Sequence, residues 1–342
     1  MSHVQTFKQS AKERLRKFLQ TGAEDERNSI VPLTPDASTR EYFRVKWKNA
    51  SAIACVYPEK FEPEENSYLD ATNLFRASNL PVAEIHAFDG AHGVIILEDF
   101  GDKILRDFLA QAEAEERENL INESIRLIAK IQAATEKAFE LNSVASHLAF
   151  DAEKLGWELN FFKTHYFESY RQEPLTVFDE NALRAEFEEI SEELEGHVKV
   201  LCHRDFHAAN LMIDGTDKLR IIDHQDARMG AVSYDLVSLL LDRVVEPPGT
   251  VWIREKRLYF LAAREELGLE TIDPDEFARE FRLQTIQRCL KAIGTFSFQT
   301  AVRSRDGYAQ YIEPMFRIVF QAAERLERFP HLQRIIKERI NE

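Results

Sequence analysis

Two short segments near the middle of the chain carry most of the side chains that could do chemistry. The first matches the pattern H-R-D-x-x-x-x-N, and its specified residues are His203, Arg204, Asp205 and Asn210. The second places Asp223 at the end of an apolar strand. In such a pattern an aspartate orients an attacking hydroxyl and accepts its proton, while an amide and a second carboxylate bind magnesium on ATP phosphates. The spacing therefore predicts phosphoryl transfer, with Asp205 as the catalytic residue and Asn210 and Asp223 as Mg²⁺ ligands.

The elements around these residues give the spacing a structural reason. A short apolar strand precedes the motif, and residues 211–222 are predicted to form a hairpin with an Asp-Gly turn. The loop between the strand and the hairpin begins with Asp205 and ends with Asn210. Because the second hairpin strand runs back, it returns Asp223 to the same place.

Other interpretations of the same residues remain open. His203, Asp205 and His207 alternate along the chain and could be zinc ligands, but Arg204 and Asn210 would then have no role. Asp205 could also be an ordinary solvated carboxylate of a loop. Under the phosphoryl-transfer interpretation, we expect His203 to hold the loop backbone and Arg204 to pack against a carbonyl or carboxylate.

Composition limits the class of protein. The 342 residues are 44% hydrophobic and 30% charged, which suits one large or two moderate globular domains. No run approaches the ~18 apolar residues of a membrane span, and the N-terminus lacks a signal-peptide core, so we expect a cytoplasmic protein without membrane contact.

The dispersed Cys55, Cys202 and Cys289 predict neither a disulfide nor a thiolate metal site. A net charge of −15 argues against a nucleic-acid partner, and no protein partner is indicated.

The first hundred residues predict an antiparallel sheet. An amphipathic helix comes first, from Val4 to about Gly22, and another helix over residues 63–77 interrupts the strands. The predicted strands are residues 29–33, 41–47, 51–57, 84–88 and 93–98. We place a domain boundary after Gly101, because almost everything beyond it follows helical spacing.

This order of elements predicts an α+β protein with a two-lobe, protein-kinase-like fold. The small lobe, residues 1–101, would contain the five-stranded antiparallel sheet and bind the nucleotide. The large helical lobe, residues 102–342, would carry the catalytic hairpins and bind the substrate. Its helices are expected at residues 103–139, 151–170, 181–195, 233–242, 252–267, 273–298 and 308–328.

Three further segments resemble those of the aminoglycoside phosphotransferase and choline kinase family of small-molecule kinases. They are DASTREYFRV (residues 36–45), IDHQDA (222–227) and VSYDLVSLL (232–240). Within that family, the first two are most similar to segments of bacterial kinases that phosphorylate the anomeric hydroxyl of N-acetylmuramate and N-acetylglucosamine, although His224 replaces a phenylalanine. Protein kinases have D-F-G at the second segment, followed by a long activation loop and A-P-E, which this chain lacks. The resemblance implies an ATP- and Mg²⁺-dependent kinase acting on a small metabolite.

The turn over residues 34–40 lies where kinases cover the ATP phosphates. It contains no glycine, but Ser38 and Thr39 can present N–H and hydroxyl groups, and Arg40 adds a positive charge. We therefore take these three residues as nucleotide-binding candidates. An ordinary surface turn is the alternative.

The third predicted strand lacks the lysine that kinases place there, an absence that the similar sugar kinases share. The candidates to replace it are Arg40, Arg44 and Lys60, with Glu64 or Glu65 as the acid on the following helix. The missing lysine also leaves open a pseudokinase or a nucleotide-responsive binding protein. The complete set of catalytic and metal-binding side chains argues against that alternative.

The remaining candidates depend on less specific signals. Glu98 and Phe100 flank the predicted hinge, where main-chain groups would bind adenine, although a strand that leads into a helix explains these residues equally well. Asp235 anchors the catalytic loop, as the resemblance implies, or is simply favoured by the dipole at a helix N-terminus. The candidates for substrate contacts are His207, Gln225, Asp226 and Arg228.

The acceptor that the resemblance implies is the anomeric hydroxyl of an N-acetylated amino sugar of the N-acetylmuramate or N-acetylglucosamine type, and the alternative is an aminoglycoside or other amino alcohol. Acids such as Glu158 and Asp226 would suit a cationic amino sugar, whereas His207, Arg228 and Arg288 would suit a carboxylated one. Aromatic side chains at helical spacing could stack on a sugar ring or simply fill the core. These are Trp157, Phe161, Phe162 and Tyr166.

Overall fold

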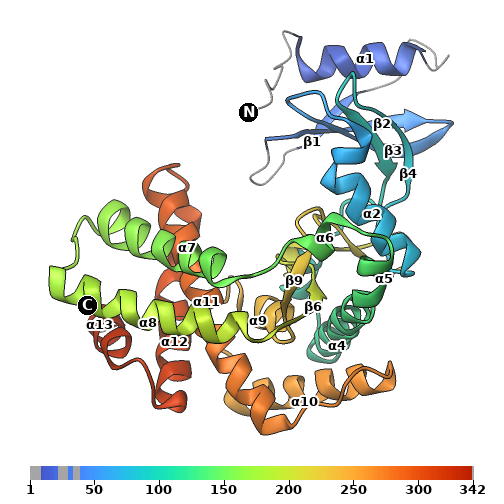
Figure 1. Ribbon diagram of the computed structural model, residues 1–342. Helices are drawn as coiled ribbons and strands as arrows, with labels where there is room; N and C mark the ends of the chain where they lie inside the picture. Colours follow the sequence, from blue (N-terminus) through green and yellow to red (C-terminus); the bar gives the residue numbers. More distant parts are fainter. Residues whose placement is uncertain (1–8, 22–29, 34–38, 341–342) are drawn as a thin grey trace. The chain divides into compact units, whose positions relative to one another are not determined.

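A computed structural model describes residues 9–21, 30–33 and 39–340 of the chain (Figure 1). These residues group into two compact units. The smaller unit contains the described residues up to Ala110 together with Ala209–Gln225, and the larger unit contains the rest. The hairpin between Asn210 and Asp223 therefore belongs to the smaller unit, and the lobe boundary expected after Gly101 stays a prediction.

The smaller unit is built on a five-stranded antiparallel sheet, which confirms the prediction. Its strands are β1 (Val31–Leu33), β2 (Glu41–Trp47), β3 (Ala50–Val56), β4 (Ile85–Asp89) and β5 (Val94–Glu98). They lie in the order β1-β2-β3-β5-β4, and every neighbouring pair is antiparallel. Between β2 and β3, Lys48 and Asn49 have φ angles of +44° and +68°. Two positive φ angles in a two-residue turn match the twist of the strands that the turn joins.

Each face of this sheet buries a different set of side chains, because successive residues of a strand point to opposite sides. On one face, Ala54 of β3 belongs to the same apolar cluster as Leu15 of helix α1 (Ala11–Thr21). On the other face, Cys55 belongs to a cluster with Tyr68 of helix α2 (Ser67–Ala77). The first residues of the predicted N-terminal helix lie outside the described residues.

The single helix expected over residues 63–77 is divided in the structure. A 3₁₀ turn, η1 (Pro63–Glu65), precedes α2, and Asn66 between them has an extended backbone with φ −84° and ψ 108°. The side-chain oxygen of Asn66 accepts hydrogen bonds from the N–H groups of Tyr68 and Leu69, both at 3.1 Å. Asn66 is thus the N-cap of α2, and the prediction of one continuous helix was wrong at this residue.

The predicted hairpin is formed by β7 (Leu211–Ile213) and β8 (Leu219–Ile221), which pair antiparallel. Asp214 stabilises its turn, since its carboxylate accepts a hydrogen bond from the N–H of Thr216 and pairs with Arg220 at 2.6 Å. Backbone hydrogen bonds of 2.9 Å join the hairpin to the chain at Pro81 and Lys103. The hairpin is therefore part of the smaller unit by direct backbone pairing.

The larger unit is mainly helical, as expected. The predicted helix over residues 103–139 is three helices, α3 (Leu105–Leu109) in the smaller unit and α4 (Ala114–Ala133) and α5 (Thr135–Glu140) in the larger one. The other helices of the larger unit are α6 (Val144–His147), α7 (Ala152–Lys163), the π-helical η2 (Thr164–Tyr170), α8 (Val177–Glu195), α9 (Tyr234–Leu241), α10 (Thr250–Glu266), α11 (Pro274–Ala301), η4 (Asp306–Tyr311), α12 (Ile312–Leu326) and α13 (Pro330–Ile340). No described helix is long and apolar enough to span a membrane.

One strand of the larger unit was missed. The predicted strand β6 (Val198–Cys202) pairs antiparallel with β9 (Arg228–Ala231), which has no alternating pattern. Gly230 in β9 is required by packing, because a Cβ there would lie 2.9 Å from Sγ of Cys202 and 3.0 Å from the ring of Phe150. Because glycine has no side chain, β9 lacks the alternation of apolar and polar residues by which a strand is predicted.

Gly294 lies in α11, the long central helix of the larger unit, where that helix packs against α7. A Cβ at this position would lie 2.6 Å from Cα and 2.9 Å from the nitrogen of Phe162. Because these are backbone atoms, they cannot rotate away. We expect Gly294→Ala to lower the free energy of unfolding by about 1–3 kcal/mol, measured by urea denaturation.

Gly156→Ala in α7 is the matched control. The nearest atom to a Cβ at Gly156 is Oγ of Ser191 at 3.7 Å, which is an ordinary contact. Alanine is the better helix former, so this variant should gain about 0.5–1 kcal/mol. Equal stability of the two variants would contradict the close packing of α11 on α7.

Candidate active site

The loop that follows β6 is held by Asp235, the second residue of α9. The carboxylate of Asp235 accepts hydrogen bonds from the backbone N–H groups of His203 at 2.6 Å and Arg204 at 3.0 Å. Asp235 and His203 are fully buried. Arg204 has a φ of +87°, a conformation that costs energy for an arginine and therefore depends on such contacts. The carboxylate of Asp235 therefore anchors the backbone of the loop at His203 and Arg204.

Asp205 lies among three cationic side chains. Its carboxylate is 3.4 Å from Nζ of Lys291, 3.5 Å from a guanidinium nitrogen of Arg288 and 3.7 Å from Nε of Arg204. The side chains of Lys291 and Arg288, both on α11, are largely buried, whereas that of Asp205 is 31% exposed. The carboxylate is therefore compensated in charge and still accessible.

These neighbours set the protonation state of Asp205. Burial acts to raise its pKa, but the charges of Lys291, Arg288 and Arg204 outweigh burial and hold the pKa well below its ordinary value. Such an acidic group is a weak general base, because the best bases have a pKa near the working pH. It can still orient a hydroxyl and accept the proton late, which suits a loose phosphoryl-transfer transition state.

Lys291→Met tests this electrostatic arrangement through the pH dependence of turnover. A lowered pKa keeps Asp205 ionised in acid, so loss of one positive charge lets burial raise the pKa and lets protonation begin at higher pH. Wild-type kcat should show no acid limb from Asp205 between about pH 4 and pH 8, whereas kcat of Lys291→Met should fall at the acid end of that range. Lys291→Arg keeps the charge and should keep the wild-type profile. The same shift in both variants would show that packing, rather than charge, is responsible.

Asn210 and Asp223 lie at the open end of the β7–β8 hairpin. A short turn, η3 (Ala208–Asn210), leads into β7, and Asp223 follows β8 after Ile222. The N–H of Ile222 donates to the backbone carbonyl of Asn210 at 3.1 Å. The hairpin therefore brings the two predicted metal ligands to the same end, as their spacing implied.

Asp223 lies in a left-handed backbone conformation with its carboxylate partly exposed. Its φ is +63°, its side chain is 44% exposed, and its carboxylate accepts a hydrogen bond from Nε2 of Gln225 at 2.9 Å. Together with the amide of Asn210, it offers the oxygen donors that Mg²⁺ prefers. The described residues contain no cluster of three or more His, Cys, Asp or Glu side chains suited to a metal. One carboxylate and one amide, completed by phosphate oxygens and water, still fit Mg²⁺.

Arg40 lies beside Asp223, with its guanidinium 3.5 Å from Oδ1 and over the rings of Tyr42 and Tyr57. Of the three candidates to replace the missing strand lysine, Arg40 is the one that reaches the predicted metal ligand. Arg44 pairs instead with Asp99 and Asp102.

The other candidates for contacts with the nucleotide lie on the surface. Thr39 of the phosphate turn, Lys60, which was considered in place of the strand lysine, and the helix acids Glu64 and Glu65 are exposed. Ser38 lies outside the described residues. Arg40 is therefore the part of the predicted phosphate turn that the structure places at the candidate site.

The predicted hinge residues have clear structural contacts. The carboxylate of Glu98 accepts a hydrogen bond from the N–H of Glu84 at 3.1 Å, and Phe100 is buried in the sheet core with the guanidinium of Arg220 over its ring. Their side chains therefore make structural contacts, and binding of adenine by the backbone of this segment stays a prediction.

His224, which replaces a phenylalanine of the similar kinases, is buried in the smaller unit. Its ring packs against Tyr68 and Phe75, with centroids 5.0 and 5.1 Å away. Thr72 donates its hydroxyl to the carbonyl of Tyr68 at 2.6 Å, so Nε2 of His224 donates to Thr72 at 2.8 Å. The histidine thus keeps the aromatic packing and adds one hydrogen bond that anchors the residue next to Asp223.

The substrate candidates are divided between the units. Gln225 contacts Asp223, whereas Asp226 pairs with Arg204 at 2.9 Å and with Arg228 at 4.0 Å in the larger unit. Burial lowers the pKa of His207, and Asp242 opposes that effect.

The predicted aromatic residues also differ in placement. Phe162 and Tyr166 are core residues, whereas Trp157 is 57% exposed with Nζ of Lys154 4.3 Å from its ring centroid. Of the four aromatic residues named for stacking on a sugar, Trp157 presents the most open ring.

Sequence reasoning missed Lys291. This residue contacts Asp205, the hydroxyl of Tyr234 at 3.4 Å and the buried carboxylate of Glu158 at 3.8 Å. Arg288, considered only for a carboxylated substrate, lies one turn earlier on α11 and also pairs with Asp242 at 2.9 Å. The sequence signal for this pair was its spacing: Arg288 and Lys291 are three residues apart, on the same face of a helix whose other residues are mostly buried.

Comparison with known proteins gives a consistent result. Residues 29–274 match the phosphotransferase enzyme family APH. The chain is 28% identical over 305 residues to the N-acetylmuramate/N-acetylglucosamine kinase of Neisseria meningitidis, covering 87% of this chain and 86% of that protein. It is 29% identical over 313 residues to the enzyme of the same name from Pseudomonas putida, covering 89% and 85%.

Solved structures share the fold. A microcompartment-associated aminopropanol kinase superposes with a TM-score of 0.61 at 16% identity, covering 92% of this chain and 97% of that one. A choline kinase from Streptococcus pneumoniae gives 0.56 at 12% identity, covering 91% and 98%. A GDP complex of an aminoglycoside phosphotransferase gives 0.58 at 16% identity, covering 92% and 98%. The protein-kinase-like fold and the small-molecule kinase predicted from the sequence are confirmed, and the chain belongs to the APH phosphotransferase enzyme family.

Proposed function

We propose that this protein is an ATP- and Mg²⁺-dependent kinase that phosphorylates the anomeric hydroxyl of an N-acetylated amino sugar of the N-acetylmuramate or N-acetylglucosamine type. The observation that carries the proposal is the similarity to kinases named for these two sugars, which extends over 87–89% of the chain. Similar solved structures with ADP or GDP bound support the use of a nucleotide.

The charges around Asp205 support a neutral or anionic acceptor over an aminoglycoside. Lys291, Arg288 and Arg204 lie within 3.7 Å of its carboxylate. An aminoglycoside carries several ammonium groups, and the acids near this site, Asp226, Glu158 and Asp242, are already paired with these same cations, so they offer little attraction to such groups. An N-acetylated sugar carries an amide in place of the amine and needs no such attraction.

In the proposed mechanism, Asp205 accepts a hydrogen bond from the anomeric hydroxyl and aligns its oxygen for in-line attack. The amide of Asn210 and the carboxylate of Asp223 would hold Mg²⁺, which neutralises charge on the phosphates when it is bound. Arg40, next to Asp223, adds a fixed positive charge for phosphate oxygens. Asp205 takes the proton as the oxygen–phosphorus bond forms and the bond to the leaving ADP breaks.

The test offers MgATP with four acceptors in parallel, namely N-acetylmuramate, N-acetylglucosamine, kanamycin and choline, and identifies products by ³¹P NMR. We expect transfer to one or both sugars, with the phosphate on the anomeric carbon. The methyl glycoside of N-acetylglucosamine, in which that hydroxyl is blocked, should not react. Equal phosphorylation of the glycoside, or preference for kanamycin or choline, would refute the proposed acceptor while leaving the kinase reaction intact.

A further inference from the structure

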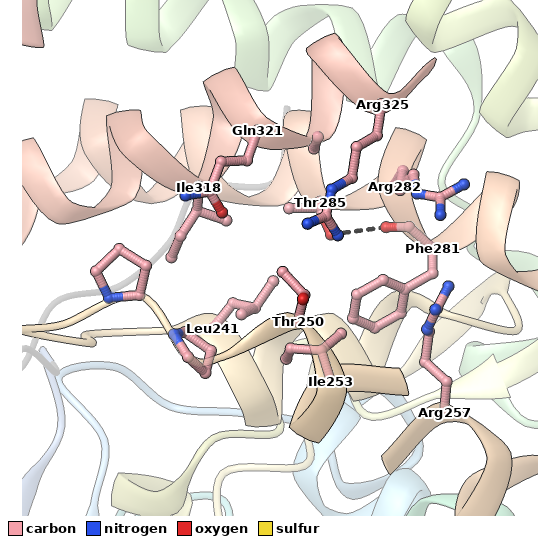
Figure 2. Close-up of a pocket in the computed structure, with 13 residues that line it drawn as sticks. Leu241, Thr250, Ile253, Arg257, Phe281, Arg282, Thr285, Ile318, Gln321 and Arg325 are labelled. Atoms are coloured by element: carbon pink, nitrogen blue, oxygen red, sulfur yellow. Dashed lines mark hydrogen bonds between the residues drawn. The ribbon is translucent and has the colours of Figure 1, made fainter. Parts of the chain in front are cut away.

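A pocket of the larger unit lies between α10, α11 and α12. Figure 2 shows Arg257, Arg282 and Arg325 on one side of it, around the ring of Phe281, with Leu241 and Ile318 on the other side. The cavity is small, about 70 Å³, and partly open to solvent, so part of a bound ligand would stay exposed. We call it the three-arginine pocket.

None of these three arginines forms a salt bridge with a described residue, although other arginines of this chain pair extensively. The guanidinium of Arg257 lies over Phe281, 5.6 Å from the ring centroid, and its buried Nε has no hydrogen-bond partner among the described residues. In a chain with a net charge of −15, such a gathering of unpaired positive charge is unexpected.

The electrostatics agree with this geometry. Burial, and then the charges of Arg282, Arg254 and Arg325, lower the pKa of Arg257, and Asp275 is the nearby acid that opposes them. Burial and the charge of Arg325 likewise lower the pKa of Arg282. The arginines therefore repel one another, and a bound anion would relieve the repulsion.

We propose that the three-arginine pocket binds a small organic phosphate. Guanidinium groups present N–H donors in pairs that match phosphate oxygens, and a dianion compensates three positive charges better than a single carboxylate does. The apolar side chains of Leu241, Ile253 and Ile318 would cover the carbon part of the ligand. A phosphate monoester with a compact apolar group satisfies both sides of the pocket.

This pocket is distinct from the cluster around Asp205, although both use α11. Arg288 directs its guanidinium to Asp205, Asp242 and Ser238 and does not line the pocket. Arg282 and Thr285 line the pocket from earlier turns of the same helix. The proposal does not depend on the substrate proposed above, since it concerns residues that take no part in that reaction.

The test measures binding of phenyl phosphate, benzoate and benzyl alcohol by calorimetry at constant ionic strength. We expect phenyl phosphate to bind most tightly, benzoate more weakly and benzyl alcohol not at all. Arg257→Gln and Arg282→Gln should each weaken phenyl phosphate binding about tenfold or more, because each removes charged donors. Arg254→Gln, which removes a charge from the same helix but does not line the pocket, should change it less than about threefold.

Two controls test the electrostatic basis of the pocket and the location of the bound phosphate. Without ligand, Arg282→Gln should melt no lower than wild type, because it removes a repulsion; a large drop would contradict the electrostatic basis. Arg40→Gln should keep phenyl phosphate binding. Loss of binding in Arg40→Gln together with wild-type binding in Arg282→Gln would place the phosphate at the nucleotide site and overturn the proposal.

Discussion

Replacing Asp205 with asparagine is expected to lower kcat by about 10²- to 10⁴-fold while leaving nucleotide affinity nearly unchanged. Asparagine keeps the shape of the side chain but loses the negative charge that aligns the acceptor hydroxyl and takes its proton. It also leaves Lys291 and Arg288 without one of their partners, although Glu158 and Asp242 remain to pair with them. Turnover with the best acceptor and the Kd of MgADP would be measured side by side.

Asp217→Asn is the matched control for this experiment. Asp217 lies in the turn of the β7–β8 hairpin, its side chain is 83% exposed, and its ion pair with Lys103 is long at 3.4 Å. An exposed pair of this kind contributes little, so the variant should keep wild-type kcat. A wild-type rate in Asp205→Asn would remove Asp205 from the reaction.

Replacing Asp223 with asparagine is expected to raise the Mg²⁺ concentration for half-maximal rate by about tenfold or more. Loss of residues that only support a metal ligand already costs about 10–100-fold in affinity, and a direct ligand should cost at least as much. Asparagine tolerates the φ of +63° as well as aspartate does, so the substitution tests charge rather than backbone strain. Initial rates over a Mg²⁺ titration at fixed ATP provide the measurement.

Gln225→Ala separates binding of the metal from orientation of the carboxylate. The amide of Gln225 donates to Oδ1 of Asp223 at 2.9 Å. Loss of this amide should therefore raise the Mg²⁺ concentration for half-maximal rate by less than the loss of the Asp223 carboxylate does. An unchanged Mg²⁺ titration in Asp223→Asn would show that this carboxylate does not bind the ion. Asn210 and the substrate phosphates would then have to supply the ligands.

Several parts of the fold were predictable because their signals are local. β-branched and aromatic residues in short runs indicate the strands β2, β3 and β5, and the turns at Lys48–Asn49 and Asp214–Gly215 indicate hairpins. The short distance along the chain between Asp205, Asn210 and Asp223 made the chemistry recognisable for the same reason.

The secondary-structure prediction failed where a single residue interrupts the periodic pattern of its segment. Asn66 caps α2 inside a stretch with helical spacing, and Gly230 hides β9 because the strand must approach Cys202 and Phe150 closely. In both cases, one residue was selected for a hydrogen bond or a contact that periodicity does not record.

The sequence by itself determined the family, the sheet and the residues of the catalytic motif. Only the tertiary structure decided the electrostatic setting of that motif and the composition of the three-arginine pocket. Lys291 lies 86 residues from Asp205 along the chain, and Arg257 lies 68 residues from Arg325. Charges so far apart in the chain interact only after the helices that carry them have packed, and helix packing depends on side-chain shape rather than on charge pattern.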